Sequence, residues 1–252
     1  MRIAVAGGTG AVGSHIVEVA RERGHEAVVL SRSAGVDVVR GTRLDEALEG
    51  VDAVVDVVSV QTRDTEESTE FFGAVTRQLL RAGRAAGVGH HVALSIVGID
   101  AAPEGYYAGK QLQEQLVAAG DVPWTILRAT QFHEFAQQIF GAFTVGPVSL
   151  VPVMRSQPVA AREVAERLVD LVEEGPSGRV PDLAGPEEVR MVDMVRAYAR
   201  RIGVRAPVLQ VPLPGAGGRA MRDGSLVPAP GADLGRTTFA EWLAQVDVPP
   251  RI

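Results

Sequence analysis

The sequence predicts an α/β fold built on a doubly wound parallel sheet, followed by a smaller C-terminal region. Over residues 1–130, short runs that are apolar almost throughout alternate with amphipathic stretches of helical period. Strands of this kind are typical of a parallel sheet whose two faces are both covered by helices. A glycine-rich turn joins the first apolar run to the first helical stretch, as such folds require.

Composition sets limits on the function. Of the 252 residues, 46% are apolar and 22% are charged, as in ordinary soluble globular proteins. The absence of cysteine excludes disulfides and thiol nucleophiles, and it fits a cytoplasmic location. A net charge of −6 and scattered basic residues argue against nucleic-acid binding. A strand-like start at residue 2 and short apolar runs indicate neither a secretory signal nor a membrane span.

The first half of the chain is expected to contain six strands, each followed by a turn or a helix. The expected strands are 2–7, 26–32, 36–41, 51–59, 90–98 and 124–130. The expected helices are 11–24, 44–50, 69–87 and 107–120, with an acidic loop at 61–68. Right-handed crossovers would wind these strands into a single sheet.

The alternation of strands and helices is lost after Thr130. Helices are expected at 131–143, 160–175, 191–203 and 237–246, with extended segments at 148–154 and 179–187. The stretch 212–235 is dense in glycine and proline and is expected to be loop-rich. Its Pro212–Gly231 part fits either a mobile lid or an ordered surface loop.

Three glycines spaced three residues apart follow the first strand. In this strand–loop–helix context, Gly7, Gly10 and Gly13 indicate a cradle for a dinucleotide pyrophosphate. Gly7 is expected to take a positive φ, Gly10 to let the phosphates approach and Gly13 to let the helix pack close. The backbone amides of Thr9 and Val12 are candidate phosphate donors. A tight turn that binds no ligand is the alternative.

The end of the second strand predicts which dinucleotide binds. An NAD-binding site usually has a carboxylate here, whereas this chain has Ser31, Arg32 and Ser33. A guanidinium pairs with a 2′-phosphate and hydroxyls add hydrogen bonds, so NADP(H) is favoured over NAD(H). Val58 and Ser59 at the end of the strand 51–59 are expected to line the adenosine side. A solvated Arg32 that rests on the adenine is the alternative.

A tyrosine, a lysine and a serine form the candidate catalytic set. Tyr106 and Lys110 stand four residues apart at the start of a helix and therefore share one face. Ser95 lies at the carboxyl side of the strand 90–98, where open α/β sheets bind ligands. A lysine one helical turn away is expected to lower the pKa of the tyrosine by stabilising its phenolate. A wall tyrosine beside a surface lysine is the alternative.

These motifs resemble the short-chain dehydrogenase/reductase superfamily, and more narrowly its atypical, NmrA-like NAD(P)H-binding branch. The resemblance covers nearly the whole chain and includes GTRLDEALEGVDAVVDVVS, HHVALSIVGID, VPWTILRATQFHEF, LAGPEE and RDGSLVPAPGADLGRTTFAEWL. It implies that Tyr106 is the general acid of a hydride transfer. It also implies that Lys110 holds the nicotinamide ribose and that Ser95 orients the substrate oxygen.

The chain departs from the family pattern at three positions. Gly109 stands where the family usually has alanine or serine, and Thr42 stands where many relatives have an adenine-contacting aspartate. Tyr107 is adjacent to Tyr106 but is only three residues from Lys110, so Tyr106 is the better candidate for the acid.

A substrate pocket is expected after the strand 124–130. Gln131 and Phe132 are candidates for its wall, and His133 for its lining or for a second acid. No histidine and carboxylate stand at metal-ligand spacing, so no metal is expected. The absence of a G-x-S-x-G elbow argues against a serine hydrolase.

Together, these features predict two regions and an enzyme. Residues 1–145 are expected to form an NADP(H)-binding Rossmann domain, and residues 146–252 a substrate-capping region that partly returns to the core at about 158–185. The predicted function is an NADPH-dependent oxidoreductase of the atypical short-chain type that reduces a small carbonyl or conjugated molecule. An NADP(H)-binding sensor or regulator without turnover and a non-redox isomerase or cyclase are the alternatives. The expected state is a monomer or homodimer, and the substrate's identity and the direction of reaction stay open.

Overall fold

A computed structural model describes residues 1–146 and 148–247. The chain forms two compact units, and each is described by itself. The first unit comprises Met1–Arg128 and Arg162–Pro181, and the second comprises Ala129–Ala161 and Asp182–Ile252. The predicted division into an NADP(H)-binding region, 1–145, and a substrate-capping region, 146–252, stays a prediction.

The first unit contains a parallel sheet with helices on both faces. Its strands follow the order β5-β4-β3-β1-β2, and β9 pairs with β5. The strands are β1 (Arg2–Ala6), β2 (Glu26–Leu30), β3 (Ala53–Asp56), β4 (His90–Ile96), β5 (Trp124–Ala129) and β9 (Gly178–Arg179). The predicted doubly wound parallel sheet is therefore confirmed.

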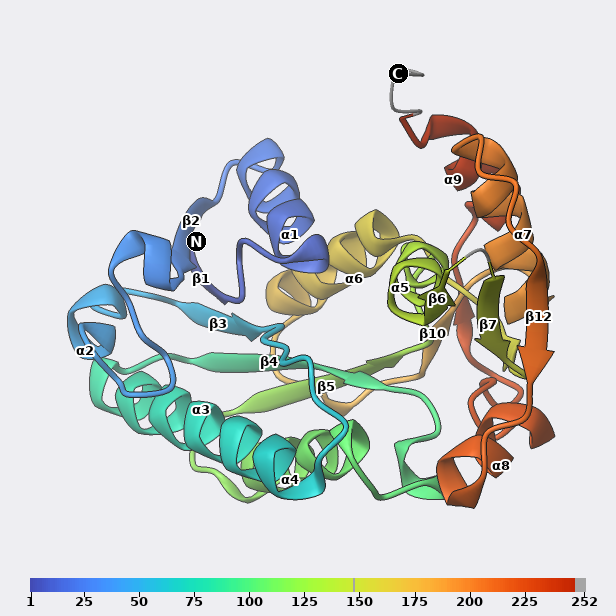
Figure 1. Ribbon diagram of the computed structural model, residues 1–252. Coiled ribbons are helices and arrows are strands. Elements are labelled where there is room, and N and C mark those ends of the chain that lie inside the picture. The colour runs from blue at the N-terminus through green and yellow to red at the C-terminus, as the bar shows by residue number, and fades with distance from the viewer. Residues whose placement is uncertain (147, 248–252) are drawn as a thin grey trace. The chain divides into compact units, whose positions relative to one another are not determined.

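Helices cover this sheet in two groups (Figure 1). Helices α1 and α6 lie over one face, and α3 and α4 lie over the other. The helices and short 3₁₀ turns are α1 (Ala11–Glu22), η1 (Arg32–Ala34), α2 (Leu44–Ala47), α3 (Thr65–Ala86), η2 (Ile99–Ala101), α4 (Tyr106–Ala119) and α6 (Ala161–Glu174). Their apolar sides enclose a core whose largest fully buried side chains include Phe72, Leu79 and Leu127.

Two local predictions in this unit are wrong. Residues 36–41 form turns and one isolated bridge between Asp37 and Thr42, instead of a strand. The Asp37 carboxylate accepts the backbone N–H groups of Val39 and Arg40 at 2.9 and 3.1 Å, which curls this segment. Residues 65–68 belong to α3 instead of a loop, because Asp64 caps the helix by accepting the Glu67 N–H at 2.8 Å.

The second unit contains a small sheet of its own and four helices in its described residues. The parallel strands β7 and β12 pair, β6 joins β7 in antiparallel fashion, and α5 and α7 pack against β7. The strands are β6 (Thr144–Val145), β7 (Val148–Pro152), β8 (Arg155–Ser156), β10 (Leu183–Ala184), β11 (Val189–Arg190), β12 (Val208–Val211) and β13 (Asp233–Leu234). The helices are α5 (Phe135–Phe143), α7 (Met191–Arg201), α8 (Gly215–Asp223) and α9 (Phe239–Gln245).

The loop-rich expectation for 212–235 needs correction, because α8 occupies nine of these residues. Pro214 stands at its N-cap, where the missing N–H of proline costs no helical hydrogen bond, and Gly224 ends it with φ of +91°. Whether Pro212–Gly231 acts as a lid stays open. Within residues 1–146 and 148–247, no helix is long and apolar enough to cross a membrane.

Gly109 explains one departure from the family pattern. It lies where α4 meets α3, and a Cβ at this position would come within 2.6 Å of the Ser68 carbonyl oxygen and 2.5 Å of the Phe72 ring. The two helices therefore approach each other closely only because residue 109 has no side chain.

Gly109→Ala is accordingly expected to lower the free energy of unfolding by about 1–3 kcal/mol, the usual cost of overpacking. Chemical denaturation of both proteins measures the difference. Gly83→Ala in α3 is the matched control, because its new Cβ would meet only Val88 at 3.6 Å. The control should be neutral or stabilised by up to about 1 kcal/mol through helix propensity. Equal stability of the Gly109→Ala protein and wild type would refute the close approach.

Candidate active site

The glycine loop joins β1 to α1 at the point where the strand order of the sheet reverses. β1 has β2 on one side and β3 on the other, and open sheets bind ligands at such switch points, beyond the carboxyl ends of the strands. Gly7 has φ of +85°, and a Cβ there would lie 2.8 Å from the Val57 carbonyl oxygen. A Cβ on Gly13 would lie 2.1 Å from the Gly7 carbonyl oxygen. The loop therefore requires glycine at both positions.

The start of α1 fits the pyrophosphate of a dinucleotide. Gly10 is the N-cap, with extended backbone and no side-chain cap, and the first turn contains no acidic residue. The N–H groups in the first turn of a helix have no partner within that helix and attract anions. Thr9 is exposed in the loop, while Val12 is buried in the first turn. Phosphate binding by the amides of Thr9 and Val12 stays a prediction, and so does the close approach of the phosphates at Gly10, whose own N–H donates to the Gly7 carbonyl oxygen at 2.9 Å.

The three residues after β2 lie in or beside η1. Ser31 caps this turn by accepting the Ala34 N–H at 3.3 Å, and the hydroxyls of Ser31 and Ser33 lie 2.9 Å apart. Arg32 is exposed, and its side chain makes no ion pair or hydrogen bond within the part of the chain that the structure describes. A guanidinium in this position can pair with a phosphate.

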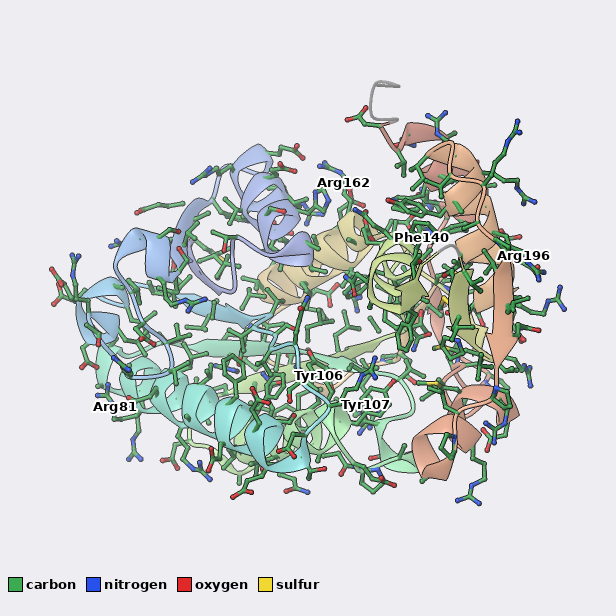
Figure 2. All side chains as sticks on the ribbon, in the orientation of Figure 1. Arg81, Tyr106, Tyr107, Phe140, Arg162 and Arg196 are labelled. Atoms are coloured by element: carbon green, nitrogen blue, oxygen red, sulfur yellow. The ribbon has the colours of Figure 1, made fainter. Side chains whose placement is uncertain are left out.

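The short segment after β3 brings the glycine loop and the candidate tyrosine together. The Val57 N–H donates to the Ala6 carbonyl oxygen at 3.0 Å, and the Val57 carbonyl oxygen leaves no room for a Cβ on Gly7. The Ser59 hydroxyl lies 3.0 Å from the Tyr106 hydroxyl. The start of α4 is fixed on α3, since the Ser68 hydroxyl donates to the Tyr106 carbonyl oxygen at 3.1 Å. Tyr106 and Tyr107 stand side by side at this helix end, with ring centroids 6.5 Å apart (Figure 2).

Both tyrosines are protonated over the physiological pH range. Burial raises the pKa of Tyr106, partly offset by its hydrogen bond with Ser59, and the negative charge of Asp56 raises it further. Burial also raises the pKa of Tyr107 to about 12. Lys110 is not among the groups that shift the pKa of Tyr106 in this structure, and the role predicted for Lys110 beside Tyr106 stays a prediction.

The Lys110 ammonium is hydrogen-bonded to other groups, which explains why it is not among those that shift the pKa of Tyr106. Lys110 is 3% exposed, and its Nζ donates to the Leu94 carbonyl oxygen at 2.6 Å and to the Gln113 side-chain oxygen. Nζ also stands 4.8 Å from the centroid of the Phe72 ring. The ring of Tyr106 also packs edge-on against the Phe72 ring, with centroids 5.4 Å apart. Burial lowers the pKa of Lys110 to about 8, while Asp56 and Glu114 oppose this shift.

Two residues of this network, Asp56 and Gln113, are absent from the sequence prediction. The Gln113 Nε2 donates to Asp56 Oδ2 at 2.8 Å, and Asp56 Oδ1 accepts the Val58 N–H at 3.2 Å. Both side chains are fully buried. The sequence does contain one signal for them, because Asp56 is a lone carboxylate in an apolar strand and Gln113 follows Lys110 at helical spacing.

Ser95 lies within β4 and is 3% exposed. Its hydroxyl has no hydrogen-bond partner among the described residues. A buried hydroxyl without a partner is costly, and it is available to a ligand oxygen. The role of Ser95 in orienting substrate stays a prediction.

The candidate pocket residues 131–133 lie in the second unit. Gln131 accepts a hydrogen bond from Ser156 at 2.9 Å, and Phe132 forms a bridge with Val159. His133 is fully buried, and its ring centroid lies 5.7 Å from that of Phe239 and 5.8 Å from that of Trp242. This packing favours a structural role for His133, and the assignment of all three to a substrate pocket stays a prediction.

Comparison with known proteins identifies the family. The profile of the NAD(P)H-binding family matches residues 7–174, which is more than half of the chain and includes the glycine loop, Tyr106 and Lys110. The chain belongs to the NAD(P)H-binding family. This membership confirms the predicted NAD(P)H-binding character of the chain. Its narrower placement in the atypical, NmrA-like branch of the short-chain dehydrogenase/reductase superfamily stays a proposal. The predicted nicotinamide cofactor agrees with this membership, and the choice of NADP(H) stays a proposal.

Individual relatives differ in what they do. The Photosystem II assembly factor Ycf39 of Synechocystis sp. is 26% identical over 239 residues, which is 84% of this chain and 71% of that protein. The UDP-N-acetylglucosamine 4-epimerase of Bacillus cereus has a TM-score of 0.69 at 17% identity and 99% coverage of both chains. A short-chain dehydrogenase/reductase superfamily protein of Agrobacterium tumefaciens with bound NAD has a TM-score of 0.68 at 20% identity, covering 97% of this chain and 95% of that one. The two structures support the fold.

The raised pKa of Tyr106 can be tested by its ultraviolet absorbance. Subtracting the pH titration of Tyr106→Phe from that of the wild type isolates the contribution of one phenol. We expect tyrosinate absorbance in this difference only above about pH 10, the ordinary pKa of tyrosine. Near-ultraviolet circular dichroism at each pH verifies that both proteins stay folded. A component that titrates below about pH 9 would show that the phenol is not desolvated as the structure has it.

Proposed function

We propose that the protein is an NADPH-dependent oxidoreductase of the atypical short-chain type that reduces a small carbonyl or conjugated substrate. The observation that carries the proposal is the segment Val57–Ser59, which contacts both the glycine loop and the Tyr106 hydroxyl. The short path from the glycine loop to Tyr106 through this segment supports the proposal that the proton donor lies close to the cofactor cradle. When bound, the nicotinamide supplies the hydride.

The chain's own residues supply the proton and orient the substrate. Tyr106 keeps its proton at neutral pH because burial raises its pKa, so it can donate to an oxygen that gains negative charge. Ser59 lies within 3.0 Å of the Tyr106 hydroxyl and fixes its direction. The unpartnered hydroxyl of Ser95 would donate to the same substrate oxygen. At neutral pH the phenol is therefore in its proton-donating form, which is the form that reduction of a carbonyl requires.

The 2′-phosphate of NADPH would pair with Arg32. Its exposed guanidinium follows β2, where no carboxylate opposes a phosphate, and Ser31 and Ser33 stand beside it. The first-turn amides of α1 would bind the pyrophosphate. The sequence predicts that Val58 and Ser59 line the adenosine side. Because the Ser59 hydroxyl lies 3.0 Å from the Tyr106 hydroxyl, we assign Ser59 to the nicotinamide side and leave only Val58 on the adenosine side.

A second candidate function is dinucleotide binding without turnover. The observation that favours it is the inward position of Lys110, whose ammonium bonds to Leu94 and Gln113 and is not among the groups that shift the pKa of Tyr106. The related Ycf39 protein is described as an assembly factor. A binding protein of this kind would hold NADPH and show no turnover with any substrate.

The choice of cofactor can be measured by fluorescence titration of the purified protein with NADPH and NADH. We expect NADPH to bind at least about tenfold more tightly, which corresponds to about 1.4 kcal/mol, a typical value for one charge-assisted pair. Arg32→Gln should weaken NADPH binding to the level of NADH and leave NADH binding unchanged. Arg40→Gln is the matched control, because Arg40 is also exposed but lies outside η1. Equal affinities in the wild type would exclude the role given to Arg32.

The proton donor can be tested with Tyr106→Phe, which keeps the ring and removes the hydroxyl. We expect turnover across a panel of carbonyl and quinone substrates to fall by at least about 100-fold, as for loss of a general acid. NADPH affinity should stay within about twofold of wild type. Tyr107→Phe is the control and should keep its activity. Full activity of Tyr106→Phe would exclude Tyr106 as the acid, and a wild type that binds NADPH but reduces nothing would favour the second candidate.

A further inference from the structure

Lys110 is the only lysine in the chain. The sequence contains 25 lysines and arginines, and every one except Lys110 is an arginine. Arginine keeps its charge at every accessible pH, whereas a buried lysine changes its charge readily. The chain therefore has its one titratable amine side chain at a buried position beside the candidate active site.

A buried ammonium needs a compensating negative charge. The direct acceptors of Lys110 are a backbone carbonyl and the Gln113 amide, and neither carries a net charge. The nearest connected carboxylate is Asp56, which Gln113 reaches through its Nε2 at 2.8 Å. Because Nε2 faces Asp56, the amide oxygen of Gln113 must face Lys110. The amide group thus relays the charge of the carboxylate to the ammonium.

The other titratable groups near Asp56, Gln113 and Lys110 are paired with other residues or uncharged. Glu114 is held by Arg128, whose Nε and Nη2 donate to its two oxygens at 2.7 and 2.6 Å. His91 has Nε2 at 4.0 Å from Asp56 Oδ2, and burial lowers the pKa of its ring, so it stays neutral at neutral pH. Tyr106 bonds with Ser59 and stays protonated. Asp56 is therefore the carboxylate that balances Lys110.

We propose that Asp56 and Gln113 are positioning residues that together hold Lys110 in its inward position and keep it charged. Asp56 also accepts the Val58 N–H, and this bond fixes the segment Val57–Ser59. One end of this segment lies beside Gly7 and the other bonds with Tyr106. One carboxylate thereby connects the amine with the candidate cofactor loop. The meaning of this arrangement for catalysis rests on the proposed function, but the charge and position of Lys110 do not.

Two substitutions remove different hydrogen bonds between Asp56, Gln113 and Lys110. In Asp56→Asn the carboxylate is replaced by an amide, so no negative charge remains to favour the ammonium. The new amide can also reverse Gln113, which would turn an N–H toward Lys110 and disfavour its charged form. Gln113→Met keeps the length of the side chain and removes both hydrogen bonds. Each change should therefore lower the pKa of Lys110.

Because only one lysine is present, its titration can be read without assignment. The full-length protein is grown with lysine labelled with carbon-13 at Cε, and the single Cε shift is followed by NMR from about pH 6 to about pH 10.5. The pKa of Lys110 in the wild type should be lowered from the ordinary value, to about 8. Asp56→Asn should lower it further by about one unit or more, and Gln113→Met should shift it in the same direction. In the double variant, the pKa of Lys110 should fall no further than in Asp56→Asn alone, because both changes disrupt the same series of hydrogen bonds.

Asp45→Asn is the matched control, because this exposed carboxylate pairs with Arg81 on the surface. It should leave the titration of Lys110 unchanged. An unchanged pKa of Lys110 in both Asp56→Asn and Gln113→Met would overturn the proposal, and so would additive shifts in the double variant. If Asp56→Asn does not fold, Gln113→Met alone decides by the same criterion.

The NMR titration needs neither cofactor nor substrate, so it separates this proposal from the proposed function. Lowered pKa values of Lys110 without NADPH-dependent turnover would support the positioning chain and count against the oxidoreductase. Where turnover needs a charged Lys110, as its predicted role at the nicotinamide ribose requires, loss of activity at alkaline pH should begin at a lower pH in Asp56→Asn than in wild type. This direction follows because Lys110 loses its charge as pH rises through its pKa, and the substitution lowers that pKa.

Discussion

The carboxylate of Asp56 is the group on which the arrangement of the candidate site depends. It stands at the end of β3, fully buried, in a strand that is otherwise apolar. A buried charge needs hydrogen bonds and a counter-charge. The Val58 N–H binds one oxygen of Asp56 and the Gln113 amide binds the other, and Gln113 also accepts a hydrogen bond from the Lys110 ammonium. The strand end and α4 are thereby connected through polar contacts inside a core that is mainly apolar.

The consequence extends to the neighbouring groups. The segment after β3 has a fixed path, so Val57 can approach Gly7 closely and Ser59 can bond with Tyr106. The rigidity of such a site comes from supporting residues that do not touch the ligand themselves. Gly109 contributes in the same way, since its missing side chain allows α4 to lie close to α3.

Much of the fold could be predicted from the sequence, because its signals are local. Apolar runs and helical periods marked most strands and helices of the first unit, and the glycine spacing marked the turn at Gly7–Gly13. The errors arose where a side chain bonds to the backbone. Asp37 curls the apolar residues 36–41 away from a strand, and Asp64 starts α3 four residues earlier than its apolar pattern indicates. Helix α8 was missed because glycine and proline are ordinarily helix breakers.

The candidate site was predictable in its residues but less so in their contacts. The four-residue spacing of Tyr106 and Lys110 placed both on one face of α4, yet it could not show that the ammonium turns toward Leu94 and Gln113. That direction depends on Asp56, which is 54 residues away in sequence and adjacent only in the folded sheet. Spacing within a helix predicts which residues are neighbours, whereas charge balance in the core determines which of them pair.

The choice of lysine at position 110 follows from the same balance. An arginine there would keep a permanent charge and needs several acceptors for its planar group, while this site offers one carbonyl and one amide oxygen. A lysine satisfies its ammonium with fewer partners and can release its proton when the counter-charge weakens. Each of the other 24 positions with a lysine or arginine has arginine, which keeps its charge permanently. At residue 110, the small number of acceptors and the possibility of a changing charge both favour the amine.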